Sequence, residues 1–167
     1  KPSSKVTYRL HMKRIIGYLF TLLLLVVLVY AGLVKGDVFP EWIMSKKLMI
    51  RCGLIGVLGG TLYCIRGVYL NKCVRNCWDD RWHVWYVLRP IVSGICGVVA
   101  YLFLKAGLIV LDASQNGSGG DYGYMAFAFF AGLNVDKFVG KIEDVGMAIF
   151  GIEKSRTARS GDNSDQK

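Results

Sequence analysis

The stretch Ile15–Val34, IIGYLFTLLLLVVLVYAGLV, decides the fold class because its twenty residues include no charged side chain. A helix needs about 20 apolar residues to cross a hydrocarbon core roughly 30 Å thick. The run exceeds the apolar core of a signal peptide, about 7 to 15 residues, and shows no clear A-x-A cleavage pattern around Ala31–Leu33. It therefore predicts a retained membrane helix that follows a basic leader, residues 1–14.

The composition fits membrane residence and weakens a nucleic-acid role. The chain is 53% hydrophobic, with a mean hydropathy of +0.38 and a formal net charge of +9. A basic balance often indicates nucleic-acid binding, but in a membrane protein it commonly reflects the excess of Lys and Arg on the cytoplasmic side. No DNA- or RNA-binding motif occurs, so we expect no direct nucleic-acid partner.

Two further apolar runs predict a second and a third span. Residues 48–70 carry Arg51 and Arg66 near their two ends, where long basic side chains can reach the headgroups. Residues 88–111 contain Pro90, which fits a first helical turn, or a kink if the helix begins earlier. The only charge deeper in this third run is Lys105.

The fourth apolar run, residues 122–133, covers only about 18 Å as a helix, which is too short for an average bilayer. Residues 135–151 then place apolar side chains on one face and charged ones on the other, so an amphipathic helix follows. Two interpretations compete: a single tilted fourth span, or a short helix that breaks into an in-plane interfacial helix. A left-handed cap at Gly132 and an N-cap at Asn134 favour the second.

The fold class predicted is thus an all-α integral membrane protein with four membrane-embedded helices, the fourth short or broken. Residues 15–152 form the membrane domain, and residues 153–167 form a polar, flexible cytoplasmic tail. Short segments on one side of the predicted membrane hold fourteen Lys and Arg, against three on the other. This bias predicts a multi-pass membrane protein with both termini in the cytoplasm.

Small residues mark the second and third spans as partners. They are Gly53, Gly56, Gly60, Ser93, Gly94 and Gly97. In lipid such residues let helices approach closely, because van der Waals packing replaces the hydrophobic effect between helices. We expect a packed hairpin, and the alternative is a glycine face that joins subunits.

Charged and polar residues near the outer side define a possible pore or cavity: Lys105, Asp112, Asp121 and Asn134. Lys105 is costly at the bilayer centre but can extend toward water from an outer position. The two interpretations, an extended surface lysine and a lysine that lines a cavity, remain open at this point.

An aromatic segment precedes the third span. Trp78, Trp82, Trp85 and Tyr86 share one helical face, and such residues prefer the headgroup zone. The functional alternative is a docking surface for a cytoplasmic protein, formed together with Phe138 and Ile142 of the amphipathic helix.

No catalytic motif is present, and neither histidine belongs to a constellation of catalytic residues. Cys73, Cys77 and His83 do not match a zinc-ligand spacing and lack a fourth ligand. We therefore expect a non-enzymatic protein without a metal or a cofactor.

Two motifs suggest a family resemblance. Residues 88–97, LRPIVSGICG, are followed by a loop and by residues 128–133, AFFAGL. This succession resembles small bacterial membrane proteins of antiphage systems, and the whole layout is similar to the four-helix membrane subunits of the Kiwa type. The resemblance implies a homo-oligomeric inner-membrane sensor or anchor that works with a cytoplasmic protein, and it supplies no catalytic residue. The alternative function is a pore-forming effector or an ion channel.

Overall fold

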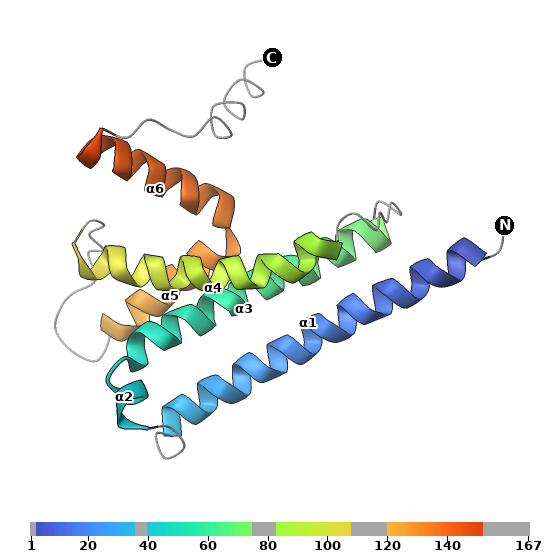
Figure 1. Cartoon of the computed structure of the whole chain (residues 1–167), viewed down its shortest axis with the longest axis horizontal. Helices are drawn as coiled ribbons and strands as arrows, with labels where there is room; N and C mark the ends of the chain where they lie inside the picture. Colours follow the sequence, from blue (N-terminus) through green and yellow to red (C-terminus); the bar gives the residue numbers. More distant parts are fainter. Residues whose placement is uncertain (1–2, 36–39, 75–82, 108–119, 152–167) are drawn as a thin grey trace.

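The computed structural model describes residues 3–35, 40–74, 83–107 and 120–151, and every element in these ranges is helical. The elements are α1 (Ser3–Lys35), α2 (Glu41–Met44), α3 (Lys47–Tyr69), η1 (Leu70–Val74), α4 (His83–Lys105), α5 (Gly120–Leu133) and α6 (Val135–Phe150). Figure 1 shows α1, α3 and α4 as three long helices, with α6 leaving the bundle at an angle.

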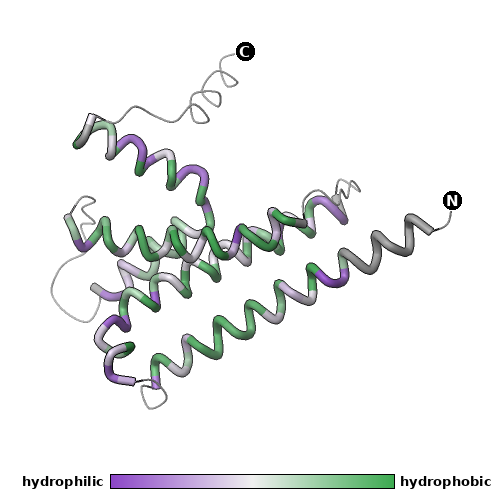
Figure 2. Tube along the Cα trace, in the orientation of Figure 1, coloured by the Kyte–Doolittle hydropathy of each residue, from purple (hydrophilic) through white to green (hydrophobic). Residues whose placement is uncertain are grey.

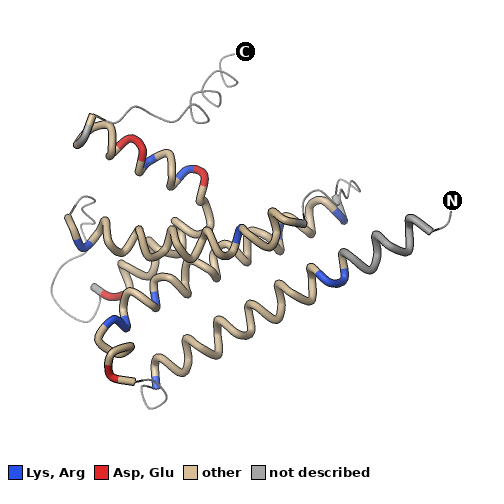
Figure 3. Tube along the Cα trace, in the orientation of Figure 1, with Lys and Arg blue, Asp and Glu red and all other residues tan. Residues whose placement is uncertain are grey.

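Three of the described helices are long and apolar enough to cross a membrane: Met12–Lys35, Lys47–Lys72 and Val84–Lys105. Figure 2 shows the hydrophobic residues that run along them. Charged residues of α1 and α3 lie mainly near the helix ends, whereas α6 carries them along its length (Figure 3). The chain is therefore an all-helical protein with three helices suited to a bilayer, and α5, with fourteen residues, covers only about 21 Å.

Helix α3 is the centre of the bundle, because it packs against α1, α4 and α5. One core cluster joins α1 to the later part of α3 and the start of α4 through Ile15, Leu19, Cys64, Val68 and Tyr86. A second cluster joins α4 to α5 and α6, with Cys96, Ala100, Ala131, Val135 and Phe138 as its buried members.

The predicted third span has different bounds from the helix observed. Helix α4 begins at His83, five residues before the predicted start, and ends at Lys105. Its early start places Pro90 inside the helix, where a proline removes one backbone hydrogen bond. The sequence analysis also missed α2 and the π-helical turn η1, which continues α3 beyond the predicted second span.

The fourth apolar run and the amphipathic segment form two separate helices, broken at Asn134. The left-handed cap expected at Gly132 is wrong, whereas Asn134 is at the N-cap position of α6, as expected. Gly132 does not have a positive φ angle, and Asn134 makes no side-chain capping bond. Gly132 is instead held against Gly56 of α3, so close helix packing explains the glycine at this position.

Helix α6 reverses the direction of α5 and rises away from α4 along its length (Figure 1). Asp136 at its start contacts Arg89 near the start of α4, and Val145 in its later half lines the same groove as Phe103 near the end of α4. Helix α6 thus leads toward the end of the bundle opposite the first residues of α1. The expected position of both termini on one side depends on residues 153–167, which lie outside the described residues.

Candidate functional site

The small residues of α3 and α4 lie where the two backbones meet. A Cβ atom on Gly56 would lie 2.5 Å from the carbonyl oxygen of Ser93 and 3.0 Å from Cα of Gly97. A Cβ atom on Gly97 would lie 2.5 Å from the carbonyl oxygen of Cys52. Gly60 faces the side chain of Ser93 in the same way. These distances leave no room for side chains at the glycines. The close contact formed by Gly56, Gly60, Ser93 and Gly97, called the seam below, therefore holds α3 against α4 within one subunit.

Helix α5 also packs against α3 near the seam. A Cβ atom on Gly59 would lie 2.6 Å from the carbonyl oxygen of Phe129, and one on Gly132 would overlap the backbone of Gly56. Gly59 belongs to the small residues of the second span that predict close packing, whereas Gly132 was expected to form a cap and not a packing contact. Three backbones therefore converge near Gly56.

This arrangement limits the proposal that glycines join subunits. Gly56, Gly60 and Gly97 are buried within the chain and are not available to another copy. Gly53 and Gly94 differ, because they also line a shallow apolar groove of about 610 Å³ on the outside of the α3–α4 pair. Only this outer pair retains a surface that a second copy can reach.

A buried arginine lies next to the seam. Arg89 is 6% exposed, and its guanidinium carbon lies 4.8 Å from the ring centre of Tyr63 and 5.3 Å from that of Trp85. Its Nη1 donates a hydrogen bond of 2.9 Å to Oδ2 of Asp136. Cation–π contacts and one carboxylate thus compensate a charge that lies within a candidate membrane span.

The carboxylate partner comes from α6. Asp136 lies in the first turn of α6, where a negative charge also interacts favourably with the helix dipole. Its side chain is 80% exposed, so the pair combines a buried cation with an accessible anion. The Nε atom of Arg89 has no hydrogen-bond partner among the described residues. This single ion pair ties the start of α6 to α4.

Sequence reasoning missed this pair. Arg89 was counted only as a cytoplasmic positive charge, and Asp136 only as part of a polar face. The feature of the sequence that could have indicated the pair is Arg89 itself, an arginine inside an apolar run and directly before Pro90. Its partner lies 47 residues away, and local periodicity carries no information about such a distant contact.

No ion pair or hydrogen bond joins the residues expected to border a pore, as far as they are described. Lys105 is the last residue of α4, is exposed, and donates a hydrogen bond of 3.2 Å to the hydroxyl of Tyr101. Asp121 begins α5, whereas Asn134 follows its last residue, about 20 Å away along the helix. Asp112 lies outside the described residues.

The expected docking surface is wrong at two of its residues. Tyr86 is only 1% exposed and accepts a hydrogen bond from Nδ2 of Asn71, while Phe138 is buried against α4 and α5. Ile142 is partly buried against the same cluster as Phe138, and Trp85 is partly buried beside Arg89. Trp78 and Trp82 lie outside the described residues. The residues of α6 that pack inside the subunit are thus mainly apolar, whereas Asp136, Lys137 and Lys141 are exposed.

Comparison of the chain with protein-family models, with curated proteins and with solved structures gives no match.

Proposed function

We propose that this chain is a non-enzymatic inner-membrane subunit that forms homo-oligomers and transmits a disturbance of the cell envelope, such as phage attack, to a cytoplasmic protein in bacterial defence. The observation that carries the proposal is the position of α6. This helix lies beside a membrane-spanning helix, exposes a charged face, and is fixed at its start by the Arg89–Asp136 ion pair.

The charged face of α6 needs a polar or protein environment. Helix α6 runs from the level of Arg89 to that of Phe103, and both belong to the candidate span Val84–Lys105. A charge such as Lys141 costs about 2.5 to 3.5 kcal/mol at the bilayer centre on insertion scales. A face with several charges is therefore unsuited to lipid, and a neighbouring subunit that covers it removes this cost.

The distribution of charge on α6 supports a second copy as that neighbour. Lys137 and Lys141 are four residues apart and share one edge of the polar face. Asp136 and Glu143 are seven residues apart and share the other edge. In a ring of identical subunits, the basic edge of one helix meets the acidic edge of the next. Such a ring adds intersubunit pairs to the two that one chain already contains, Lys141–Asp144 at 3.9 Å and Arg89–Asp136 at 2.9 Å.

The coupling role follows from how α6 is attached. The first half of α6 packs on α4 and α5 through Val135 and Phe138, but beyond it a groove of about 490 Å³ lies between α6 and Phe103 of α4. The break at Asn134 gives the chain a place to bend. A helix held at one end and bent at a break can adopt a second position, and a cytoplasmic partner detects it at the start of α6, which lies near the start of α4.

A second candidate function, a pore, rests on the same polar face. If the α6 helices of several copies surround a common axis, their charged residues line a water-filled passage rather than a dry interface. Purified full-length protein in a planar bilayer distinguishes the two functions, because reproducible unitary currents are expected only from the pore.

The homo-oligomer is tested by counting subunits of the full chain in nanodiscs. We expect a defined oligomer for the wild type and mainly monomers for Lys137→Glu/Lys141→Glu, because this variant makes both edges of α6 acidic. Lys46→Glu/Lys47→Glu, at the start of α3, is the matched control and should leave the oligomer intact. A wild-type monomer, or equal loss of assembly in the control, would contradict the proposal.

The coupling is tested by purifying the full chain from bacterial cells before and after phage challenge. We expect one cytoplasmic protein to co-purify in a fixed ratio, and this ratio should change on challenge. An identical set of co-purifying proteins in both states, for an oligomer that is otherwise intact, would count against the coupling role.

A further inference from the structure

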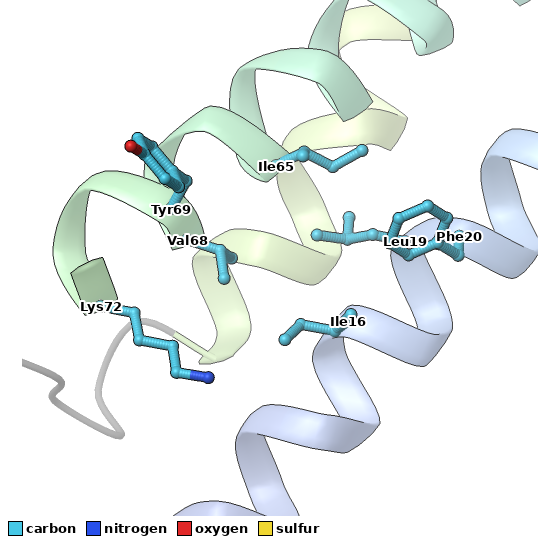
Figure 4. A pocket seen from close by; sticks show the side chains of 7 residues that line it. All are labelled: Ile16, Leu19, Phe20, Ile65, Val68, Tyr69 and Lys72. Carbon is cyan, nitrogen blue, oxygen red and sulfur yellow. The ribbon is translucent and has the colours of Figure 1, made fainter.

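An apolar groove lies between α1 and α3 (Figure 4). It encloses about 250 Å³, and its walls come from Ile16, Leu19 and Phe20 of α1 and from Ile65 and Val68 of α3. Lys72 of η1 stands at one end and extends toward α1 (Figure 4). The groove is thus lined by apolar side chains, and Lys72 is the one charged residue among those that line it.

The place of this groove in the bundle defines what can fill it. Its walls belong to two helices suited to cross a membrane, Met12–Lys35 and Lys47–Lys72. Protein interiors and lipid-facing surfaces are close-packed, so an apolar groove between spanning helices is filled by apolar matter. In a bilayer, the apolar groups available to fill the groove are the acyl chains of lipids.

The charges at the end of the groove are all positive. Lys72 ends one candidate span, while Lys13 and Arg14 lie at the start of the other, and all three side chains are exposed. Helices α1, α3 and α4 and the turn η1 contain no Asp or Glu. Among the described residues these three cations have no ion-pair partner. The described residues thus place only positive charge at this end of the groove, which favours an anionic ligand there.

We propose that this groove binds an anionic phospholipid, with one acyl chain between α1 and α3 and the phosphate on Lys72, assisted by Lys13 or Arg14. Basic sites between membrane helices on the cytoplasmic side are suited to anionic headgroups. Lys72 belongs to a π-helical turn, a rare geometry that often accompanies functional sites. The apolar walls select a lipid over a free phosphate, because a free phosphate leaves the groove empty.

The lipid site rests on one part of the proposed function, namely that α1 and α3 insert into the membrane. It adds to that function a lipid that the subunit binds. A lipid between these helices fixes α1, which otherwise makes fewer contacts with the bundle than α4 or α5 does. Lipid composition then influences the same subunit that we propose as a sensor.

Native mass spectrometry and thermal unfolding of the full chain in detergent test this site, with phosphatidylglycerol, phosphatidylcholine or inorganic phosphate added separately. We expect retained phosphatidylglycerol and a higher Tm with that lipid than with either other addition. Lys72→Gln should lower phosphatidylglycerol occupancy about fivefold, the effect of one basic residue near an anionic headgroup. Lys105→Gln, which removes an exposed cation at the far end of α4, is the control and should leave occupancy unchanged.

A second variant tests the apolar part of the groove. Ile65→Trp should reduce lipid retention by filling the groove while Lys72 remains, and Ile16→Phe does the same from α1 if the first variant does not fold. Equal retention of both lipids, no effect of Lys72→Gln, or the same Tm increase with inorganic phosphate would overturn the proposal. Lost capture of a cytoplasmic protein with lipid binding intact would instead contradict only the coupling role.

Discussion

Replacing Gly56 by leucine is expected to unfold the helical bundle of each subunit. A Cβ atom at this position would lie 2.5 Å from the carbonyl oxygen of Ser93, and Gly132 of α5 already lies against the backbone of Gly56. Backbone atoms cannot move aside as a flexible side chain can. Overpacking in a core usually costs about 1 to 3 kcal/mol, and contact with two backbones places this variant at or above the upper end.

The measurement is the midpoint of thermal or SDS-induced unfolding of the full chain, followed by circular dichroism. Gly17→Leu is the matched control, because no atom lies within 4 Å of a Cβ built on Gly17 in α1. The control should unfold close to the wild type. If Gly56→Leu instead keeps the wild-type midpoint and loses only its oligomeric state, the seam belongs between subunits and not within one.

Replacing Asp136 by alanine is expected to destabilise the junction of α4 and α6 by about 3 to 5 kcal/mol. This range is typical when one partner of a buried ion pair is removed and the other charge stays buried. Arg89, at 6% exposure, cannot move into water without leaving Tyr63 and Trp85. Arg89→Met should cost less, because the Asp136 it leaves behind is 80% exposed and remains hydrated.

A double-mutant cycle tests this asymmetry. The variant Arg89→Met/Asp136→Ala should recover most of the stability that Asp136→Ala loses, since it leaves no buried charge behind. Lys46→Ala, at an exposed residue just before α3, is the control and should change stability by less than about 0.5 kcal/mol. The unfolding midpoint of the full chain measures all four variants. Equal losses for Arg89→Met and Asp136→Ala would show that the ion pair does not fix α6.

The membrane helices could be predicted because apolar length is a local property of the chain. The predicted spans 15–34 and 48–70 nearly coincide with the helical segments Met12–Lys35 and Lys47–Tyr69. The start of α4 was harder to predict, because its first residues are aromatic and because Arg89 is a charged residue of the kind that usually lies outside the membrane. The break at Asn134 was visible as a change from an apolar run to an amphipathic pattern.

The candidate site could be predicted only in part. The small residues of α3 and α4 suggested a close approach, but glycine serves both helix caps and tight packing, so the role of Gly132 was misjudged. The direction of α6 depends on a contact between Arg89 and Asp136, which are distant in sequence. A pattern of polar and apolar residues defines the two faces of a helix but not the neighbour that each face meets.

The return of α6 along α4 is the claim on which the homo-oligomer and the coupling role both depend. Distances between spin labels test it most directly, on the full chain in nanodiscs diluted with unlabelled protein. One label replaces Met147 of α6, and the other replaces either Leu102 or Val84 of α4, all of them exposed positions. Leu102 and Val84 are about 27 Å apart along α4. The distance from Met147 to Leu102 should be clearly shorter than the distance from Met147 to Val84, and the reverse order would contradict the account.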